Sequence, residues 1–148
     1  MDDNRNLTPR TAKRATALPV SGSLFTVNGK VIIVELIGDI TAGLDANATA
    51  SKIVATPTVG TPRDLCTATD IASYALGDLV GIPGGLIDAP GALQPTTTGG
   101  AIAAMTTPMI VKAGTIDLNV AAPGQITGRI AWTIKWIPLD DGATIVPV

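Results

Sequence analysis

The chain has 148 residues, of which 46% are hydrophobic and only 15% are charged, with a formal net charge of −2 and no histidine. This length is that of one domain with a sizeable core. Histidine is the usual proton shuttle at neutral pH and the commonest metal ligand, so its absence excludes most enzyme mechanisms and many metal sites. We therefore expect a protein that is not an enzyme, with no catalytic, cofactor-binding or metal-binding residues.

The charged fraction lies well below the roughly 25% of ordinary soluble domains. A chain with so few charges is expected to bury part of its apolar surface against another protein, most simply another copy of itself. The alternative is that Ser, Thr and Gly cover the outside without charge, as in many all-β proteins.

Neither a membrane span nor a secretion signal is expected. The longest apolar run, Val31 to Ile37, is interrupted by Glu35 and is far shorter than the roughly 18 residues that cross a bilayer. The charged N-terminus is not followed by an apolar segment. The single cysteine, Cys66, is interpreted as a small sheet residue, because no histidine exists to activate its thiol.

Residues 1–20 are predicted to form an extended arm, followed by a single β domain over residues 21–148. The arm has no sustained periodicity, and its first 14 residues carry four basic groups against two acidic ones, which gives +2: Arg5, Arg10, Lys13 and Arg14. The other residues hold six basic and ten acidic groups, which gives −4. The arm is expected to be flexible in the isolated protein and to contact acidic groups of a partner. A free, solvated terminus is the alternative.

Residues 23–41 predict two strands joined by a hairpin. Ser23–Val27 ends at Asn28-Gly29, a pair that tolerates the positive φ angles of a two-residue turn. The next run, Lys30–Thr41, is apolar on two faces, with Ile32, Val34 and Leu36 on one and Val31, Ile33 and Ile37 on the other. A strand with two apolar faces is covered on both. The second face is therefore predicted to contact a neighbouring subunit.

Further strands are predicted over Ala50–Thr56 and Leu65–Ser73, with a turn-rich segment over residues 57–62 between them. Residues 82–100 contain three prolines and two glycine pairs, which predicts a long loop interrupted by a short strand. Loops of this length in a compact domain are usually functional surfaces.

The C-terminal half predicts strands over Met109–Val111, Thr115–Val120 and Arg129–Ile137. The last has large apolar groups at every second position: Ile130, Trp132, Ile134 and Trp136. Such alternation is typical of a half-buried strand. Both tryptophans are predicted to lie in the core; the alternative is an exposed pair on which a ligand stacks.

About eight to ten short strands with Gly/Pro turns between them predict an all-β fold, either an antiparallel, jelly-roll-like β-sandwich or a small barrel. Asp140-Asp141 before Gly142 is ordinary turn chemistry, with a calcium-ligand pair as the alternative. A glycosidase needs two carboxylates across a cleft, and a sheet face or a turn accounts for each candidate separately: Glu35, Asp39, Asp70 and Asp117. Nucleic-acid binding is disfavoured by the domain's negative charge and few aromatic residues.

Several turn-and-strand segments resemble one known group of proteins: residues 24–31, 36–41, 55–66, 113–118, 128–134 and 136–143. They are similar to small structural proteins encoded in the head genes of tailed bacteriophages. The resemblance covers most of residues 23–145 and leaves out the arm.

The resemblance implies a virion component without catalytic residues or a cofactor. The expected role is a capsid decoration (cement) protein or a minor head protein, commonly a homotrimer on the head shell. Its partner would be the major capsid protein, and its location the phage head surface after synthesis in the host cytoplasm; no nucleic acid or membrane is expected as a partner. Alternatives are a glycan- or host-binding module of a head fibre or tail, and a tail tube or connector protein.

Overall fold

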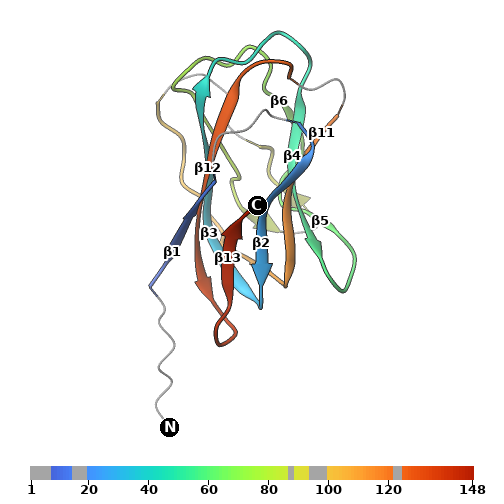
Figure 1. Ribbon diagram of the computed structural model, residues 1–148, viewed down its shortest axis with the longest axis vertical. Helices are drawn as coiled ribbons and strands as arrows, with labels where there is room; N and C mark the ends of the chain where they lie inside the picture. Colours follow the sequence, from blue (N-terminus) through green and yellow to red (C-terminus); the bar gives the residue numbers. More distant parts are fainter. Residues whose placement is uncertain (1–7, 15–19, 87–88, 94–99, 122–124) are drawn as a thin grey trace.

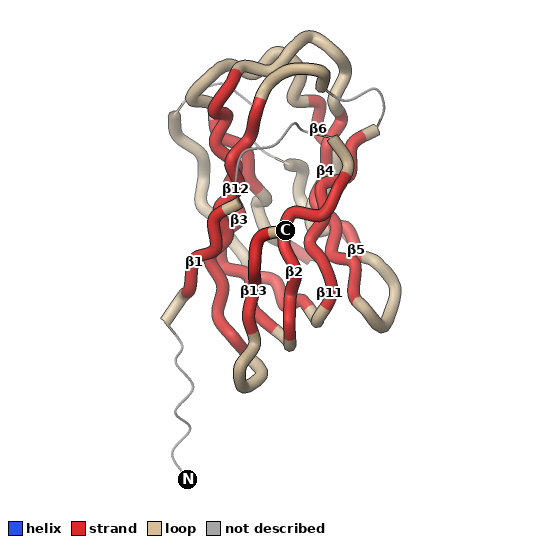
Figure 2. The backbone as a smooth tube through the Cα atoms, in the orientation of Figure 1, coloured by secondary structure: helices blue, strands red, loops and turns tan. Residues whose placement is uncertain are grey.

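The computed structural model describes residues 8–14, 20–86, 89–93, 100–121 and 125–148. These residues form two antiparallel sheets with no helix between or around them (Figures 1 and 2). The predicted all-β fold with a sandwich of two sheets is therefore confirmed. Within the described residues there are thirteen strands, more than the sequence indicates, because several are only two or three residues long.

One sheet, sheet A, has the strand order β1-β12-β3-β10, and β7 also pairs with β3. Its strands are β1 (Arg10–Lys13), β3 (Val31–Ala42), β7 (Leu79–Gly81), β10 (Met109–Val111) and β12 (Arg129–Pro138). The other, sheet B, has the order β13-β2-β11-β4-β5, and β6 also pairs with β4. Its strands are β2 (Gly22–Asn28), β4 (Ala50–Pro57), β5 (Arg63–Asp64), β6 (Thr69–Asp70), β11 (Gly114–Val120) and β13 (Thr144–Pro147). A small pair, β8 (Gly85–Leu86) and β9 (Ala89–Pro90), completes the set.

The Asn28-Gly29 turn does not make the predicted hairpin. β2 belongs to sheet B and β3 to sheet A, so the chain passes from one sheet to the other at this point. The corner is held by the loop after β12: the backbone N–H of Lys30 donates to Asp140 Oδ2 over 2.8 Å, and the N–H of Leu139 donates to the Lys30 carbonyl over 2.9 Å. Asp140 therefore has a turn role, as its sequence context indicates. The hairpin prediction is wrong because the turn pattern is local, whereas the contacts that hold this corner come from a loop that is distant in the sequence.

The hydrophobic core fills the space between the sheets, and both tryptophans belong to it. Trp132 is 1% exposed and Trp136 is 4% exposed, so the prediction that they are buried is confirmed. Trp132 lies opposite Gly38 in the pairing of β12 with β3. A Cβ at Gly38 would lie 3.0 Å from Cε3 of Trp132 and 2.6 Å from Cγ2 of Ile130. The indole thus occupies the space that a side chain at Gly38 would need.

The strand predicted over Leu65–Ser73 is reduced to β6. Asp70 Oδ1 accepts hydrogen bonds from the backbone N–H groups of Thr49 (2.9 Å) and Ala72 (3.0 Å), and Ser73 has a φ of +65°. These interactions turn the chain, because a short acceptor side chain competes with ladder formation.

Cys66 lies between β5 and β6 and is fully buried. Its Sγ accepts a hydrogen bond from the backbone N–H of Ile53 over 3.2 Å. Burial raises the pKa of the thiol to about 11. The thiolate is the reactive form of cysteine, so this thiol is unreactive at neutral pH.

Part of the predicted arm belongs to the sandwich. Residues 10–13 form β1, which pairs with β12 so that Arg10 lies opposite Trp136 and Lys13 opposite Thr133. Ala12 packs against the core. The expectation of a flexible arm is therefore wrong for these residues, and the boundary after residue 20 does not separate an arm from a domain. β1 was missed because its apolar content is one alanine, and its order comes from pairing with β12.

Candidate functional site

The two faces of β3 are apolar, as predicted, but their membership differs from the simple alternation. Val31 and Ile33 are 0% exposed and face the core, so the prediction that they contact another subunit is wrong. The pairing of β12 with β3 shifts register between Lys135 and Trp136, which is a β-bulge. A bulge places two successive residues on the same side of a strand. Beyond it the inward positions are even-numbered, and Ile37, the third predicted contact residue, faces outward and is partly buried.

Isoleucines lie side by side across three strands on the outer face of sheet A. Ile32 of β3 lies opposite Ile110 of β10 on one side and Ile137 of β12 on the other. Directly opposed residues of antiparallel strands point to the same face of a sheet. Ile110 is 60% exposed, and the other two are partly exposed. We call the outward apolar set of this sheet the isoleucine face: Ile32, Val34, Ile37, Ile110 and Ile137.

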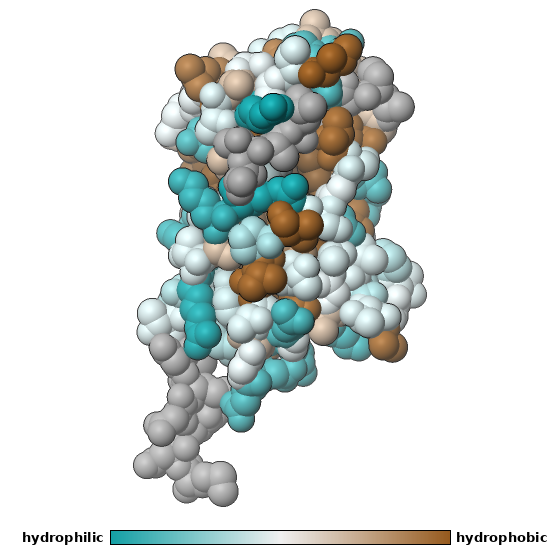
Figure 3. Space-filling model, viewed as in Figure 1, coloured by the Kyte–Doolittle hydropathy of each residue, from teal (hydrophilic) through white to brown (hydrophobic). Residues whose placement is uncertain are grey.

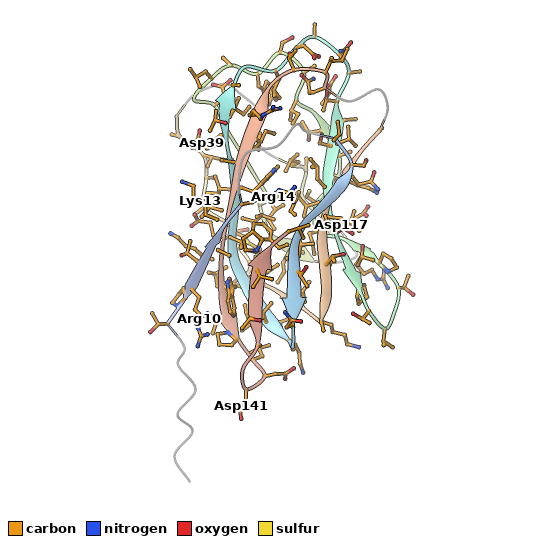
Figure 4. All side chains as sticks on the ribbon, in the orientation of Figure 1. Arg10, Lys13, Arg14, Asp39, Asp117 and Asp141 are labelled. Carbon is orange, nitrogen blue, oxygen red and sulfur yellow. The ribbon has the colours of Figure 1, made fainter. Side chains whose placement is uncertain are left out.

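The outer face of sheet B has a different chemistry. Thr115 of β11 lies opposite Thr26 of β2 and Thr56 of β4, which gives a row of three hydroxyl groups. Thr56 Oγ1 donates to Asp117 Oδ2 over 2.6 Å, and Asp117 is labelled on this side of the sandwich in Figure 4. A row of threonines thus lies on the outer face of sheet B, where the outer face of sheet A has a row of isoleucines.

The basic residues of the N-terminal segment lie along and just after β1 (Figure 4). The guanidinium carbon of Arg10 is 5.5 Å from the centroid of the Trp136 ring. The guanidinium of Arg14 donates to the carbonyl of Ser23 in β2, so it links the end of β1 in sheet A to sheet B. Lys13 is exposed. Two of these predicted partner-binding residues therefore contact their own subunit, and Arg5 lies outside the described residues.

Deleting residues 2–14 is expected to lower the free energy of unfolding by about 1–3 kcal/mol, because the Arg10–Trp136 and Arg14–Ser23 contacts are lost. The measurement is urea unfolding followed by circular dichroism. Deleting only residues 2–7 is the control, because it leaves β1 in place. Equal unfolding midpoints for the two deletions would show that β1 does not stabilise the domain.

The candidate carboxylates are placed separately and do not form a catalytic pair. Glu35 and Asp39 lie on the outer face of sheet A, where Glu35 is 3.7 Å from Lys135 Nζ and Asp39 is exposed. Asp117 lies on the outer face of sheet B, and Asp70 holds a turn. A glycosidase requires two carboxylates facing each other across a cleft, and this arrangement does not provide them.

Two polar side chains, Gln125 and Asp45, hold the loops that follow β3 and precede β12. Gln125, 3% exposed, accepts from the backbone N–H of Asp45 and donates to the carbonyl of Asn47 over 2.9 Å. Asp45 accepts from the N–H groups of Asn47, Ile126 and Thr127. These hydrogen bonds, chiefly that from Asn47, lower the pKa of Asp45. These hydrogen bonds join the two loops, so the grouping of Asp45 and Gln125 is explained by a structural role.

The predicted long loop contains the β8–β9 pair, and residues 87–88 and 94–99 of it lie outside the described residues. Leu93 is 0% exposed, and its N–H donates to the Thr67 carbonyl over 2.9 Å. The described end of this loop is therefore anchored to the core. Because the two tryptophans are buried, they do not form a platform on which a ligand could stack.

Across the described ranges, no helix has the length and hydrophobicity of a membrane span, and no three potential metal-ligating side chains lie together. On the side where β1 and β13 lie, hydrophobic residues form separate spots among hydrophilic ones (Figure 3).

Comparison with known proteins gives no match to a protein family, to a curated protein or to a solved structure. The function is therefore argued from the surfaces of the sandwich.

Proposed function

We propose that this protein is a structural component of a bacteriophage virion, a capsid decoration protein that binds and stabilises the head shell as a homotrimer. The observation that carries the proposal is the isoleucine face. Its members come from three adjacent strands and lie on the outside of a complete sandwich. Partly exposed apolar side chains gathered on one face in this way are typical of protein–protein contacts. The resemblance of segments within residues 23–145 to phage head proteins suggests the partner, the major capsid protein.

A contact through this face needs several of its side chains together. Fully burying one aliphatic side chain contributes about 1.5–3 kcal/mol, and association costs at least about 4 kcal/mol in lost translational and rotational freedom. One isoleucine is too little to hold subunits together. Four of the five residues of the isoleucine face are already partly buried, so each contributes less than this, and the contact needs the whole face. Glu35 and Lys135 lie on the same face, between the Ile32–Ile137 row and Ile37, and form an ion pair with each other.

The neighbouring cation on the same sheet suits a contact with an acidic shell. Lys13 lies opposite Thr133, whose side chain shares the outer face of sheet A. An exposed cation at the edge of an apolar contact fixes orientation and raises the association rate more than it raises affinity. In this proposal the isoleucine face is the contact between the three subunits, Lys13 at its edge meets the shell, and the threonine row of sheet B faces solvent. A variant that cannot form the trimer binds heads more weakly because it loses the multivalent contact.

Replacing Ile32 by aspartate tests the proposal, because a charge would be placed at the centre of the isoleucine face. Wild-type protein is expected to co-sediment with phage heads that lack it, up to a fixed ratio, and Ile32→Asp to bind about 100-fold more weakly or worse. Thr26→Asp makes the matched change on sheet B and should bind like wild type. Ile32→Thr removes the apolar contact without adding a charge and keeps the test valid if the aspartate variant folds poorly.

Two outcomes would contradict the proposal. Equal head binding by Ile32→Asp and Thr26→Asp would exclude the isoleucine face as the contact surface. Binding of wild-type protein to host surface glycans, with no binding to heads, would favour the alternative of a host-binding module.

A further inference from the structure

A second surface lies at the side of the sandwich away from β1 and β13. There, a groove of about 320 Å³ opens between β10, the last strand of sheet A, and the β4–β5 pair of sheet B. Its floor consists of buried apolar side chains, which are Ala55, Leu65 and Val111. Ile110, 60% exposed, forms part of its wall. The volume is within the range of pockets that bind small ligands or side chains, about 300–1,000 Å³.

Basic side chains surround this groove. Lys30, Arg63 and Lys112 line it, and they are three of the six basic residues that follow residue 14. No acidic residue is among the described residues that line it. Two carboxylates adjacent to the lining have contacts of their own: Asp64 is 2.9 Å from Lys52 Nζ, and Asp140 accepts from the backbone N–H of Lys30. The groove is therefore locally positive within a chain segment of net charge −4.

We infer that the groove binds an extended polypeptide segment of a partner protein in which apolar side chains alternate with carboxylates. In an extended segment, successive side chains point to opposite sides. One set would enter the floor formed by Leu65 and Val111, and the other would reach the basic rim. The edge strands β10 and β5 offer backbone groups for strand addition, which is a common way to bind extended peptides.

This inference rests on the proposed function only for the source of the segment, which would be the head shell protein. The recognition chemistry depends on the groove alone. A lipid or a nucleic acid is a poorer match, because neither combines a peptide backbone for edge pairing with apolar side chains at alternate positions.

The test uses three capped peptides of equal length that alternate valine with glutamate, glutamine or lysine. They are titrated into the ¹⁵N-labelled full chain, and amide chemical shifts are followed. The valine–glutamate peptide is expected to shift the amides of residues 63–65 and 110–112. The glutamine peptide should bind about tenfold more weakly, and the lysine peptide should not bind.

Charge reversal at the rim provides the matched variant. Lys112→Glu changes an exposed residue of the β10–β11 connection. We expect this variant to bind the glutamate peptide more weakly than wild type and to bind the lysine peptide. Lys135→Glu makes the same change on the outer face of sheet A and should leave both results unchanged. Equal binding of the glutamate and lysine peptides, shifts at residues 32–37 and 137 without shifts at 63–65 and 111–112, or no shift with any peptide would overturn the inference. No phage particle is present, so this outcome is independent of the head-binding test.

Discussion

Replacing Ile33 by aspartate is expected to prevent folding of the domain. Ile33 is 0% exposed and lies between Trp136 of β12 and Met109 of β10 in the centre of sheet A. A carboxylate placed there would have no hydrogen-bond or ionic partner, and burying such a charge costs more than about 4–5 kcal/mol, a large part of the stability of a small domain. The measurement is far-ultraviolet circular dichroism of the soluble fraction at neutral pH, followed by urea unfolding.

The neighbouring substitution Ile32→Asp is the control. Ile32 faces outward and is partly exposed, so its carboxylate remains hydrated and the isolated domain is expected to fold. If Ile33→Asp is folded and Ile32→Asp is not, the assignment of faces on the first half of β3 is reversed.

Replacing Trp132 by alanine is expected to lower the free energy of unfolding by about 3–5 kcal/mol, through lost burial and the cavity left behind. Trp132 is 1% exposed, and its ring packs over Gly38, which has no side chain to fill the space. The measurement is urea unfolding followed by circular dichroism. Trp132→Phe keeps an aromatic ring in this space and should lose less. A loss below about 1 kcal/mol for the alanine variant would show that the indole is not part of the core.

Local patterns in the sequence were sufficient for the fold class. Alternation over residues 129–137 predicted the longest strand of sheet A other than β3, and it predicted that both tryptophans are buried. The two apolar faces of β3 were also visible. Their membership was not, because the bulge opposite Lys135 depends on pairing with β12 and shifts the alternation by one position.

The surfaces that carry the proposals could not be predicted in the same way. Ile32, Ile110 and Ile137 are distant in the sequence and become neighbours only through the strand order of sheet A. The rim of the groove likewise combines residues that are distant in the sequence: Lys30 and Lys112 from two connections, and Arg63 from β5. The Asn28-Gly29 pair was misleading for the same reason: a turn motif specifies a local backbone conformation but not which strands pair.

The central claim is that the outer face of sheet A is the contact surface of an assembled particle protein. Sedimentation equilibrium of the purified wild-type chain, Ile32→Asp and Thr26→Asp tests it most directly. We predict a trimer for the wild type and for Thr26→Asp, and a folded monomer for Ile32→Asp, because only the last places a charge on the isoleucine face. A monomeric wild-type protein, or an Ile32→Asp variant that remains trimeric, would contradict the account.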